Sequence, residues 1–195
     1  MTYQLMYAPL APAVWQRLGE IPRTGWVMRG VTQPETVQEH TLALIRLAEE
    51  ADFATARADG LCEILEVHDW PEAIVGDEVI LVWNDEAKKQ QLKTAKHERE
   101  QAAMQSICAE LGVPGEAMYA LWDRYEAGVD PTARLAKELD KYQSVELALA
   151  YEMTQNISGL FKEFRDYLLP VFTHSAILTR LRELEAQAAA VGIDY

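Results

Sequence analysis

Apolar residues recur at every third or fourth position along most of this chain, and no segment alternates securely between apolar and polar residues. This spacing is typical of helices that bury one face, whereas a half-buried strand needs a period of two. The sequence therefore predicts an all-α fold. Helices are predicted at 14–18, 61–68, 87–111, 116–125, 132–151, 160–169 and 174–191, and another is predicted to start at Val37. Ile21–Gly30 is predicted to be a loop, and Val79–Trp83 either a short strand or a continued helix.

Length and charge limit the classes of partner. With 195 residues, 49% of them hydrophobic, the chain is large enough to form one globular domain with its own core. The formal net charge of −13 argues against binding a nucleic-acid polymer. The N-terminal segment does not have the features of a signal or transit peptide, and no apolar run has the length of a membrane span. We therefore expect a cytoplasmic protein without a membrane partner, in which Cys62 and Cys108 are reduced core thiols.

The stretch Glu66–Asp77 has the composition of an active site, because it holds a histidine and several carboxylates inside an apolar helical pattern. His68 follows Leu61 by seven positions on the same helical face, so its imidazole is predicted to point inward. Pro71 ends that helix and is expected to hold Trp70 in extended geometry, which leaves Asp69 in the frayed last turn. A neighbouring histidine and aspartate at a helix end suit a metal ion.

Two further side chains are placed to complete such a site. Thr36 and Glu39 form a predicted capping box before the helix that starts at Val37, and His40 lies in its first turn on the core-facing side. Asp140 lies on an apolar helix face, where a carboxylate is costly unless it is paired or bound to a metal. Imidazole nitrogens with carboxylate oxygens suit Mn, Co, Fe, Ni or Zn better than Ca.

Each of these residues also has a purely structural explanation. His40 alone is compatible with a satisfied core histidine, and Asp140 with an ion pair to Lys137 or Lys141 at the rim. The glycine-punctuated loop at 21–30 is compatible with a surface loop pinned by a buried Trp26, or with a loop in which Arg29 binds a phosphate.

Five segments together resemble the HD-domain phosphohydrolases, and within them the 5′-deoxynucleotidase group. The segments are Arg23-Thr-Gly-Trp-Val-Met-Arg-Gly30, Pro34-Glu-Thr-Val-Gln-Glu-His40, His68-Asp-Trp-Pro-Glu-Ala-Ile-Val-Gly-Asp77, Leu121-Trp-Asp-Arg-Tyr-Glu-Ala-Gly128 and Leu139-Asp-Lys-Tyr142. The resemblance implies a single HD-domain helical bundle over 1–195, with a motif-bearing core at about 14–186. The segment after Asp77 departs from the family pattern, so base and sugar preference are not carried over.

The resemblance also implies the roles of particular residues. His40, His68, Asp69 and Asp140 match the ligands of one divalent metal ion. Catalytic roles follow for Glu72, as the proton donor, and for Asp77, near the sugar. Arg23, Trp26 and Arg29 are the expected substrate-binding residues.

The implied activity is metal-dependent hydrolysis of a (deoxy)nucleoside 5′-monophosphate to nucleoside and phosphate. Two alternatives remain open: a phosphatase or phosphodiesterase for another small phosphorylated metabolite, and a helical interaction protein with a structural metal site. A homodimer is expected from dimeric relatives and from a surplus of aromatic residues. Those residues are Trp122, Tyr125, Tyr142 and Tyr151.

Overall fold

The computed structural model describes residues 3–82, 84–155 and 157–195, and within these ranges the chain is all-α, as predicted. The only β-type pairing among those residues is an isolated bridge between Pro22 and Thr36. The helices are α1 (Pro12–Leu18), α2 (Thr24–Val27), α3 (Val37–Ala48), η1 (Ala51–Phe53), α4 (Ala54–Ala58), α5 (Leu61–Val67), α6 (Glu72–Val75), α7 (Glu86–Leu111), α8 (Val113–Ala127), α9 (Pro131–Gln155), α10 (Leu160–Leu168), η2 (Leu169–Val171) and α11 (Ser175–Ala190).

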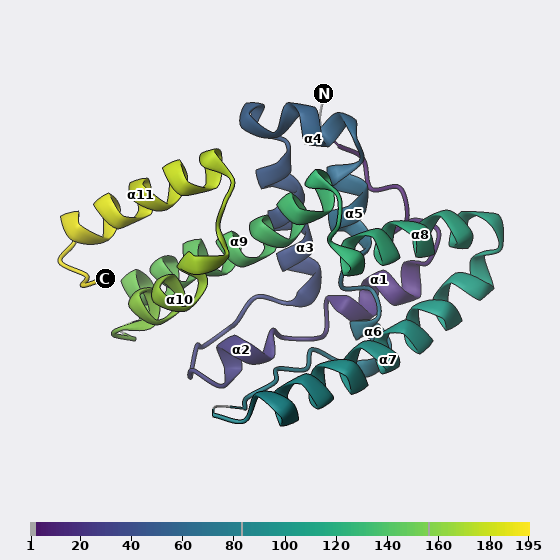
Figure 1. The fold of residues 1–195 in the computed structure, drawn as a ribbon, viewed down its shortest axis with the longest axis horizontal. Coiled ribbons are helices and arrows are strands. Elements are labelled where there is room, and N and C mark those ends of the chain that lie inside the picture. The colour runs from purple at the N-terminus through teal and green to yellow at the C-terminus, as the bar shows by residue number, and fades with distance from the viewer. Residues whose placement is uncertain (1–2, 83, 156) are drawn as a thin grey trace.

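Helix α9 is the central element, and it contacts α3, α5, α8, α10 and α11 (Figure 1). Pro131 suits its first position because proline has no N–H to leave unpaired there. The Asp130 carboxylate accepts the next two N–H groups, from Thr132 at 2.9 Å and Ala133 at 3.0 Å. The inward side of α9 includes Leu139, Asp140 and Gln143, so polar groups enter the interior along an otherwise apolar face.

Two hydrophobic clusters meet beside the His68–Asp69 turn. One joins α3, α5, α9 and α11, and includes Leu65; the other joins α1, α7 and α8, and includes Val67 and Trp70. The turn is therefore held between two packed cores, which fixes its backbone more firmly than an exposed helix end would be fixed.

Helix α3 starts at Val37, as predicted, and the capping box is confirmed. Thr36 Oγ1 accepts the N–H of Glu39 at 3.2 Å, and the Glu39 carboxylate accepts the N–H of Thr36 at 2.8 Å. Both terminal donors are thus satisfied, and the first turn of α3 presents His40 to the interior, fully buried.

The N-terminal segment is held against α5 by Glu66, a fully buried carboxylate near the end of that helix. It accepts hydrogen bonds from the hydroxyl of Tyr3 at 2.7 Å and from the N–H groups of Met6, Tyr7 and Ala8 at 2.7–2.8 Å. Four donors thus satisfy the buried carboxylate, and these hydrogen bonds fix the position of α5, the helix that precedes His68.

Three local predictions were wrong. Thr24–Val27 is a short helix inside the predicted loop, stabilised by an N–H bond from Met28 to the Thr24 carbonyl at 3.0 Å. Residues 76–82 form neither helix nor strand, and Trp83 lies outside the described residues. Trp70 is in a turn rather than in extended geometry. Its N–H donates a hydrogen bond to the Val67 carbonyl, and its own carbonyl accepts one from the N–H of Ala73. The turn passes directly into α6, and this packing overrides the preference of a residue before proline.

The aromatic residues that suggested a dimer are buried within the single chain. All four aromatic residues that favoured a dimer are buried, with exposed fractions from 1% for Trp122 to 9% for Tyr151, so this reason for a dimer was wrong. Cys62 and Cys108 are buried free thiols, as predicted. Among the described residues, no helix combines the length and apolarity that crossing a membrane requires.

Candidate metal centre and its cavity

The structure brings together the four side chains that the sequence singled out as metal ligands. His68 Nε2 lies 3.0 Å from Asp69 Oδ2, and His40 Nε2 lies 3.2 Å from Asp140 Oδ1. Asp69 Oδ2 is also 3.8 Å from His40 Nε2, which joins the two pairs. His40, His68 and Asp69 each offer a ligand atom within 4.8 Å of the others. Three separate helical regions, at the start of α3, the end of α5 and the middle of α9, supply the set.

The donor chemistry of this cluster fits a cation. The Nε2 atoms of His40 and His68 are buried and make no hydrogen bond within the described residues, although carboxylate oxygens lie nearby. The Nδ1 atom of His68 is 2.8 Å from the Leu65 carbonyl, which can only accept, so Nδ1 carries the proton and Nε2 presents a lone pair. Imidazole lone pairs and carboxylate oxygens facing one point are the ligands that a divalent transition metal prefers.

The electrostatic field of the cluster also favours a cation. Burial opposes the charge on Asp69, but His68 and Arg23 hold the pKa of its carboxyl well below its usual range. Asp140 is likewise kept ionised, with its pKa lowered by Lys141 and His40 despite burial. Burial alone would lower the pKa of His68, yet the carboxylates of Asp69 and Asp140 raise it. The same negative carboxylates favour a metal cation at this position.

A hydrogen-bonded chain behind His40 orients its ring. His40 Nδ1 is 2.9 Å from Gln143 Oε1, and Gln143 Nε2 donates to Glu35 Oε2 at 2.9 Å. Glu35 in turn accepts the indole N–H of Trp26 at 3.2 Å. Because the Gln143 NH₂ group donates to Glu35, its carbonyl oxygen faces His40 and accepts a proton from Nδ1. The lone pair on His40 Nε2 is then available to a metal. Gln143 could have been found as a polar residue on the apolar face of α9; nothing in the sequence pointed to Glu35.

Replacing Gln143 by leucine is therefore expected to weaken metal binding about 10- to 100-fold, the usual effect of an outer-shell partner. The leucine keeps a similar volume but cannot accept from His40, so the ring loses its fixed orientation. Metal affinity measured by chelator competition checks this expectation. Gln155→Leu is the matched control on the same helix, because among the described residues the Gln155 side chain hydrogen-bonds to Thr32, away from the cluster. Equal metal affinity in the Gln143 and Gln155 variants would contradict the orienting role.

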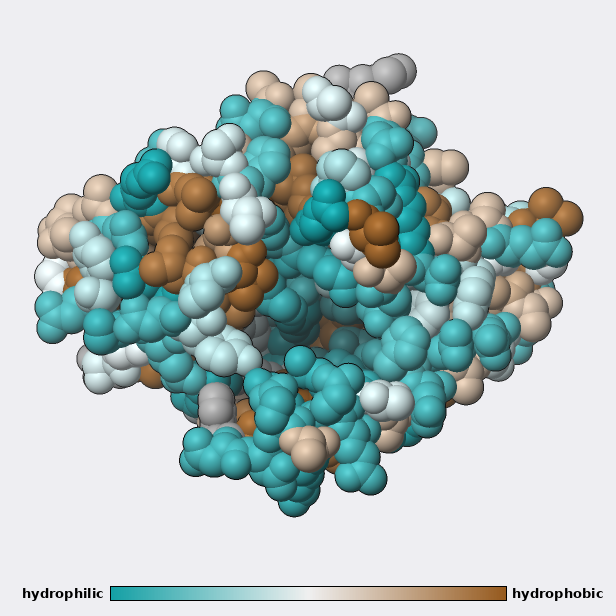
Figure 2. All heavy atoms as spheres, viewed as in Figure 1, coloured by the Kyte–Doolittle hydropathy of each residue, from teal (hydrophilic) through white to brown (hydrophobic). Residues whose placement is uncertain are grey.

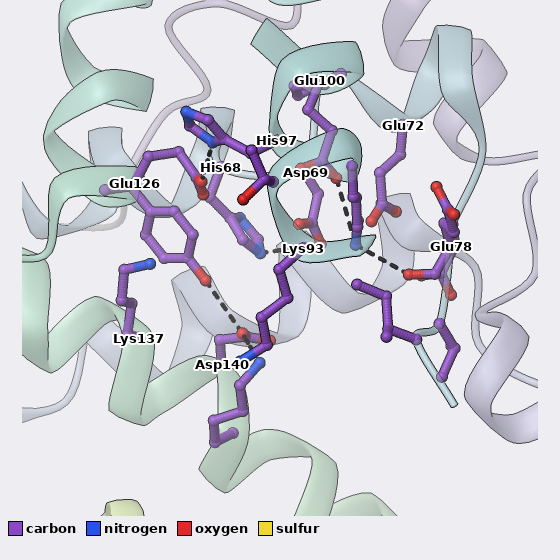
Figure 3. Close-up of a pocket in the computed structure, with 18 of the residues that line it drawn as sticks. His68, Asp69, Glu72, Glu78, Lys93, His97, Glu100, Glu126, Lys137 and Asp140 are labelled. Carbon is purple, nitrogen blue, oxygen red and sulfur yellow. Dashed lines mark hydrogen bonds and ion pairs between the residues drawn. The ribbon is translucent and has the colours of Figure 1, made fainter. Parts of the chain in front are cut away.

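Three members of the cluster, His68, Asp69 and Asp140, line a cavity of about 790 Å³, and His40 is buried behind them. Figure 2 shows a hollow near the middle of the molecule, surrounded by hydrophilic residues, where α2, α7 and α9 approach one another in Figure 1. Figure 3 shows His68, Asp69 and Glu72 on one side of the cavity and Asp140 on another. Such a cavity suits a polar ligand of small-molecule size.

Glu72 and Asp77 both line this cavity. Glu72 is buried, and its Oε2 has no hydrogen-bond partner within the described residues. Burial raises the pKa of Glu72 well above its usual value, and the charges of Asp69 and Asp77 raise it further. A carboxyl group kept protonated beside a cavity can donate a proton. Asp77 is fixed by the N–H of Thr24, which donates to its Oδ2 at 2.5 Å.

The three residues expected to bind substrate are in different environments. Arg23 lines the cavity, with its guanidinium 3.2 Å from Asp69 and 3.9 Å from Asp140. Trp26 is 2% exposed and stacks on Phe164 at 4.5 Å, so the structure places it in the core. Arg29 pairs with Glu163 and lies over the Phe164 ring. Only Arg23 of the three is among the residues that line the cavity.

The open alternative for Asp140 is partly resolved by the structure. Lys141 Nζ lies 2.7 Å from Asp140 Oδ2, which also accepts the Tyr125 hydroxyl at 3.1 Å. Lys137, the other possible partner, instead places its ammonium over the Tyr125 ring, 4.6 Å from the centroid. Asp140 thus has one surface-side ion pair and one oxygen, Oδ1, directed at His40.

Comparisons with known proteins agree with this geometry. The family model described as HD domain matches residues 15–166. The chain is 32% identical over 175 residues to 5′-deoxynucleotidase HDDC2 of Mus musculus, covering 89% of this chain and 84% of that protein. It is 32% identical over 172 residues to 5′-deoxynucleotidase HDDC2 of Homo sapiens, covering 88% and 81% of the two chains.

A solved structure shows the same fold at lower identity. The PH0347 protein from Pyrococcus horikoshii OT3 superposes with a TM-score of 0.67 at 23% identity, covering 88% of this chain and 94% of that one. Family match, relatives and the arrangement of histidines and aspartates lead to one conclusion: this chain belongs to the HD-domain family.

Proposed function

We propose that this protein is a metal-dependent phosphohydrolase that converts (deoxy)nucleoside 5′-monophosphates to nucleoside and phosphate. The observation that carries the proposal is the position of one buried carboxyl group, Glu72, which lines the same cavity as three members of the His/Asp cluster: His68, Asp69 and Asp140. The relatives named 5′-deoxynucleotidase support a nucleotide substrate.

The metal ligands in this proposal are His40, His68, Asp69 and Asp140, and Mn, Co, Fe, Ni or Zn is the expected class of ion. When bound, such an ion polarises a phosphate oxygen and lowers the pKa of water. Arg23 keeps Asp69 and Asp140 ionised and oriented, because its guanidinium contacts both. Its role is therefore to position the ligand carboxylates at the cavity wall.

Glu72 is assigned as the proton donor to the leaving 5′-oxygen. Its protonated carboxyl is the form that burial and the neighbouring charges of Asp69 and Asp77 favour. Asp77, held by Thr24 at the cavity edge, is placed to accept a hydrogen bond from a sugar hydroxyl. Arg29 and Trp26 have no contact with the cavity, and we do not assign them to the substrate.

One experiment tests the proposal and its alternatives together. Metal content of the purified protein is measured, and turnover is then compared across deoxy- and ribonucleoside 5′-monophosphates, sugar phosphates and a phosphodiester, with each of the five metals. We expect the mononucleotides to be hydrolysed fastest. A preference for a sugar phosphate or a diester would replace the substrate class. Bound metal without turnover of any ester would indicate a structural metal site in an interaction protein.

We also propose that the chain is a single HD domain over its whole length and forms a homodimer in the cytoplasm. The hydrophobic cluster that includes Leu44 extends to Ala188, which supports one domain. Light scattering at micromolar protein is expected to give twice the 22.0 kDa mass of one chain. A mass of 22.0 kDa would remove the dimer proposal.

A further inference from the structure

Two of the lysines that line the cavity have no acidic partner among the described residues. Five of its lining residues are lysine or arginine, and three of these form ion pairs: Arg23 with Asp69, Lys96 with Glu100 and Lys141 with Asp140. The other two, Lys93 and Lys137, form no ion pair within the described residues. In a chain with a formal net charge of −13, unpaired ammonium groups in a cavity are available to an anionic ligand.

Lys137 is held in place before any ligand arrives. Its ammonium lies 4.6 Å from the centroid of the Tyr125 ring, and its stem passes Gly128. A Cβ atom on residue 128 would be 3.0 Å from Lys137 Cε, so the glycine leaves room for this stem. A cation–π contact stabilises the charge of the ammonium group. Unlike a hydrogen bond to an oxygen, it does not occupy any of the three N–H donors. The half-buried ammonium therefore keeps its donor capacity for an acceptor in the cavity.

The position of Lys137 relates it to the candidate metal centre. It is three residues before Asp140 on α9, so the two side chains share one face of the helix. Tyr125 touches both, through its ring and through its hydroxyl. Lys93 lies on α7 and lines the same cavity (Figure 3). An anion between the two lysines would therefore lie beside the candidate metal ligands.

We propose that Lys137 and Lys93 form the phosphate subsite of the cavity, binding the non-bridging oxygens of a phosphomonoester dianion. This inference rests on the proposed function for the identity of the anion. It adds an orientation, because the substrate would bind with its phosphate toward α9. It also adds a selectivity, because the two ammonium groups would not increase the affinity for an uncharged analogue. Point-charge contacts from lysine suit a phosphate group that must later be released.

Calorimetric titration of the metal-loaded protein with orthophosphate, at fixed ionic strength, measures the subsite directly. Lys137→Met keeps the stem but removes the charge, and is expected to weaken phosphate binding roughly 10- to 100-fold, the usual worth of a charge-assisted hydrogen bond. Lys93→Met is expected to act in the same direction, and because Lys93 is exposed this substitution leaves core packing unchanged. Lys137→Arg restores the charge and is expected to recover most of the affinity.

Lys88→Met is the matched control, since Lys88 is an exposed lysine on α7 outside the cavity. Orthophosphate affinity equal in wild type, Lys88→Met and both cavity variants would overturn the subsite, as would a wild type that does not bind orthophosphate. An uncharged nucleoside should bind the Lys137 variant and the wild type equally; equal weakening of nucleoside and phosphate would also contradict the assignment. If phosphate binding depends on Lys137 but no mononucleotide is hydrolysed, the subsite stands and the proposed function fails.

Discussion

Replacing Glu72 by glutamine is expected to lower turnover of a nucleoside 5′-monophosphate by about 100-fold or more, the usual scale of general acid catalysis. Glutamine keeps the shape of the side chain but has no acidic proton to transfer. Glu72 lies outside the four candidate ligands, so metal content is expected to remain at the wild-type level. Steady-state turnover and metal analysis on the same preparation separate the two effects.

The pH profile gives the same variant a second readout. Because burial raises the pKa of Glu72, its protonated form persists above the pH at which an exposed glutamate ionises. A general acid is active when protonated, so wild-type turnover is expected to fall as pH rises through this raised pKa. That alkaline fall should be absent from the residual activity of Glu72→Gln. Full turnover in the variant, or loss of its metal, would contradict the assigned role.

Replacing Asp69 by asparagine is expected to remove both metal and activity. The Asp69 carboxylate is 3.0 Å from His68 Nε2 and 3.8 Å from His40 Nε2, so it contributes charge at the centre of the cluster. A neutral amide oxygen is a weaker ligand for a divalent ion. Since outer-shell partners already contribute about 10- to 100-fold, metal affinity should fall by more than about 100-fold. Turnover should fall further than in Glu72→Gln.

Asp166→Asn is the control for this substitution, because Asp166 is an exposed carboxylate paired with Lys162 and Arg165. It should retain wild-type metal content and activity. Chelator competition measures the metal affinity of both variants, and thermal melting shows whether each is folded. If Asp69→Asn kept one ion at wild-type affinity, the metal would have to be bound elsewhere, and the His68–Asp69 pair would lose its role as the centre of the site.

Patterns of neighbouring residues were sufficient for most of the fold. The three- and four-residue spacing predicted the helices, and the Thr36–Glu39 pair predicted where α3 begins, because a capping box satisfies donors within one turn. The four candidate metal ligands were found for a related reason. A charged or imidazole side chain on an apolar helix face needs a partner, and this requirement is visible without knowing what the partner is.

Residues whose environment depends on distant segments were not predictable in this way. Trp26 and Arg29 were placed at the substrate by their loop and by resemblance, but α10 lies against them and engages both through Phe164 and Glu163. Conversely, Lys137 and Lys93 are 44 positions apart and become neighbours of one cavity only when α7 packs near α9.

The sequence by itself thus determined that the chain is helical, where several helices begin and which side chains need a cation or a partner, because these follow from spacing and local hydrogen bonding. The tertiary structure decided which of those side chains share a cavity. It buried Glu72 beside Asp69 and Asp77 and, within the part of the chain that the structure describes, left Lys137 without an ion pair to a carboxylate. Burial and charge separation set the pKa of an acid and the availability of a cation, and both depend on the packing of segments far apart in the chain.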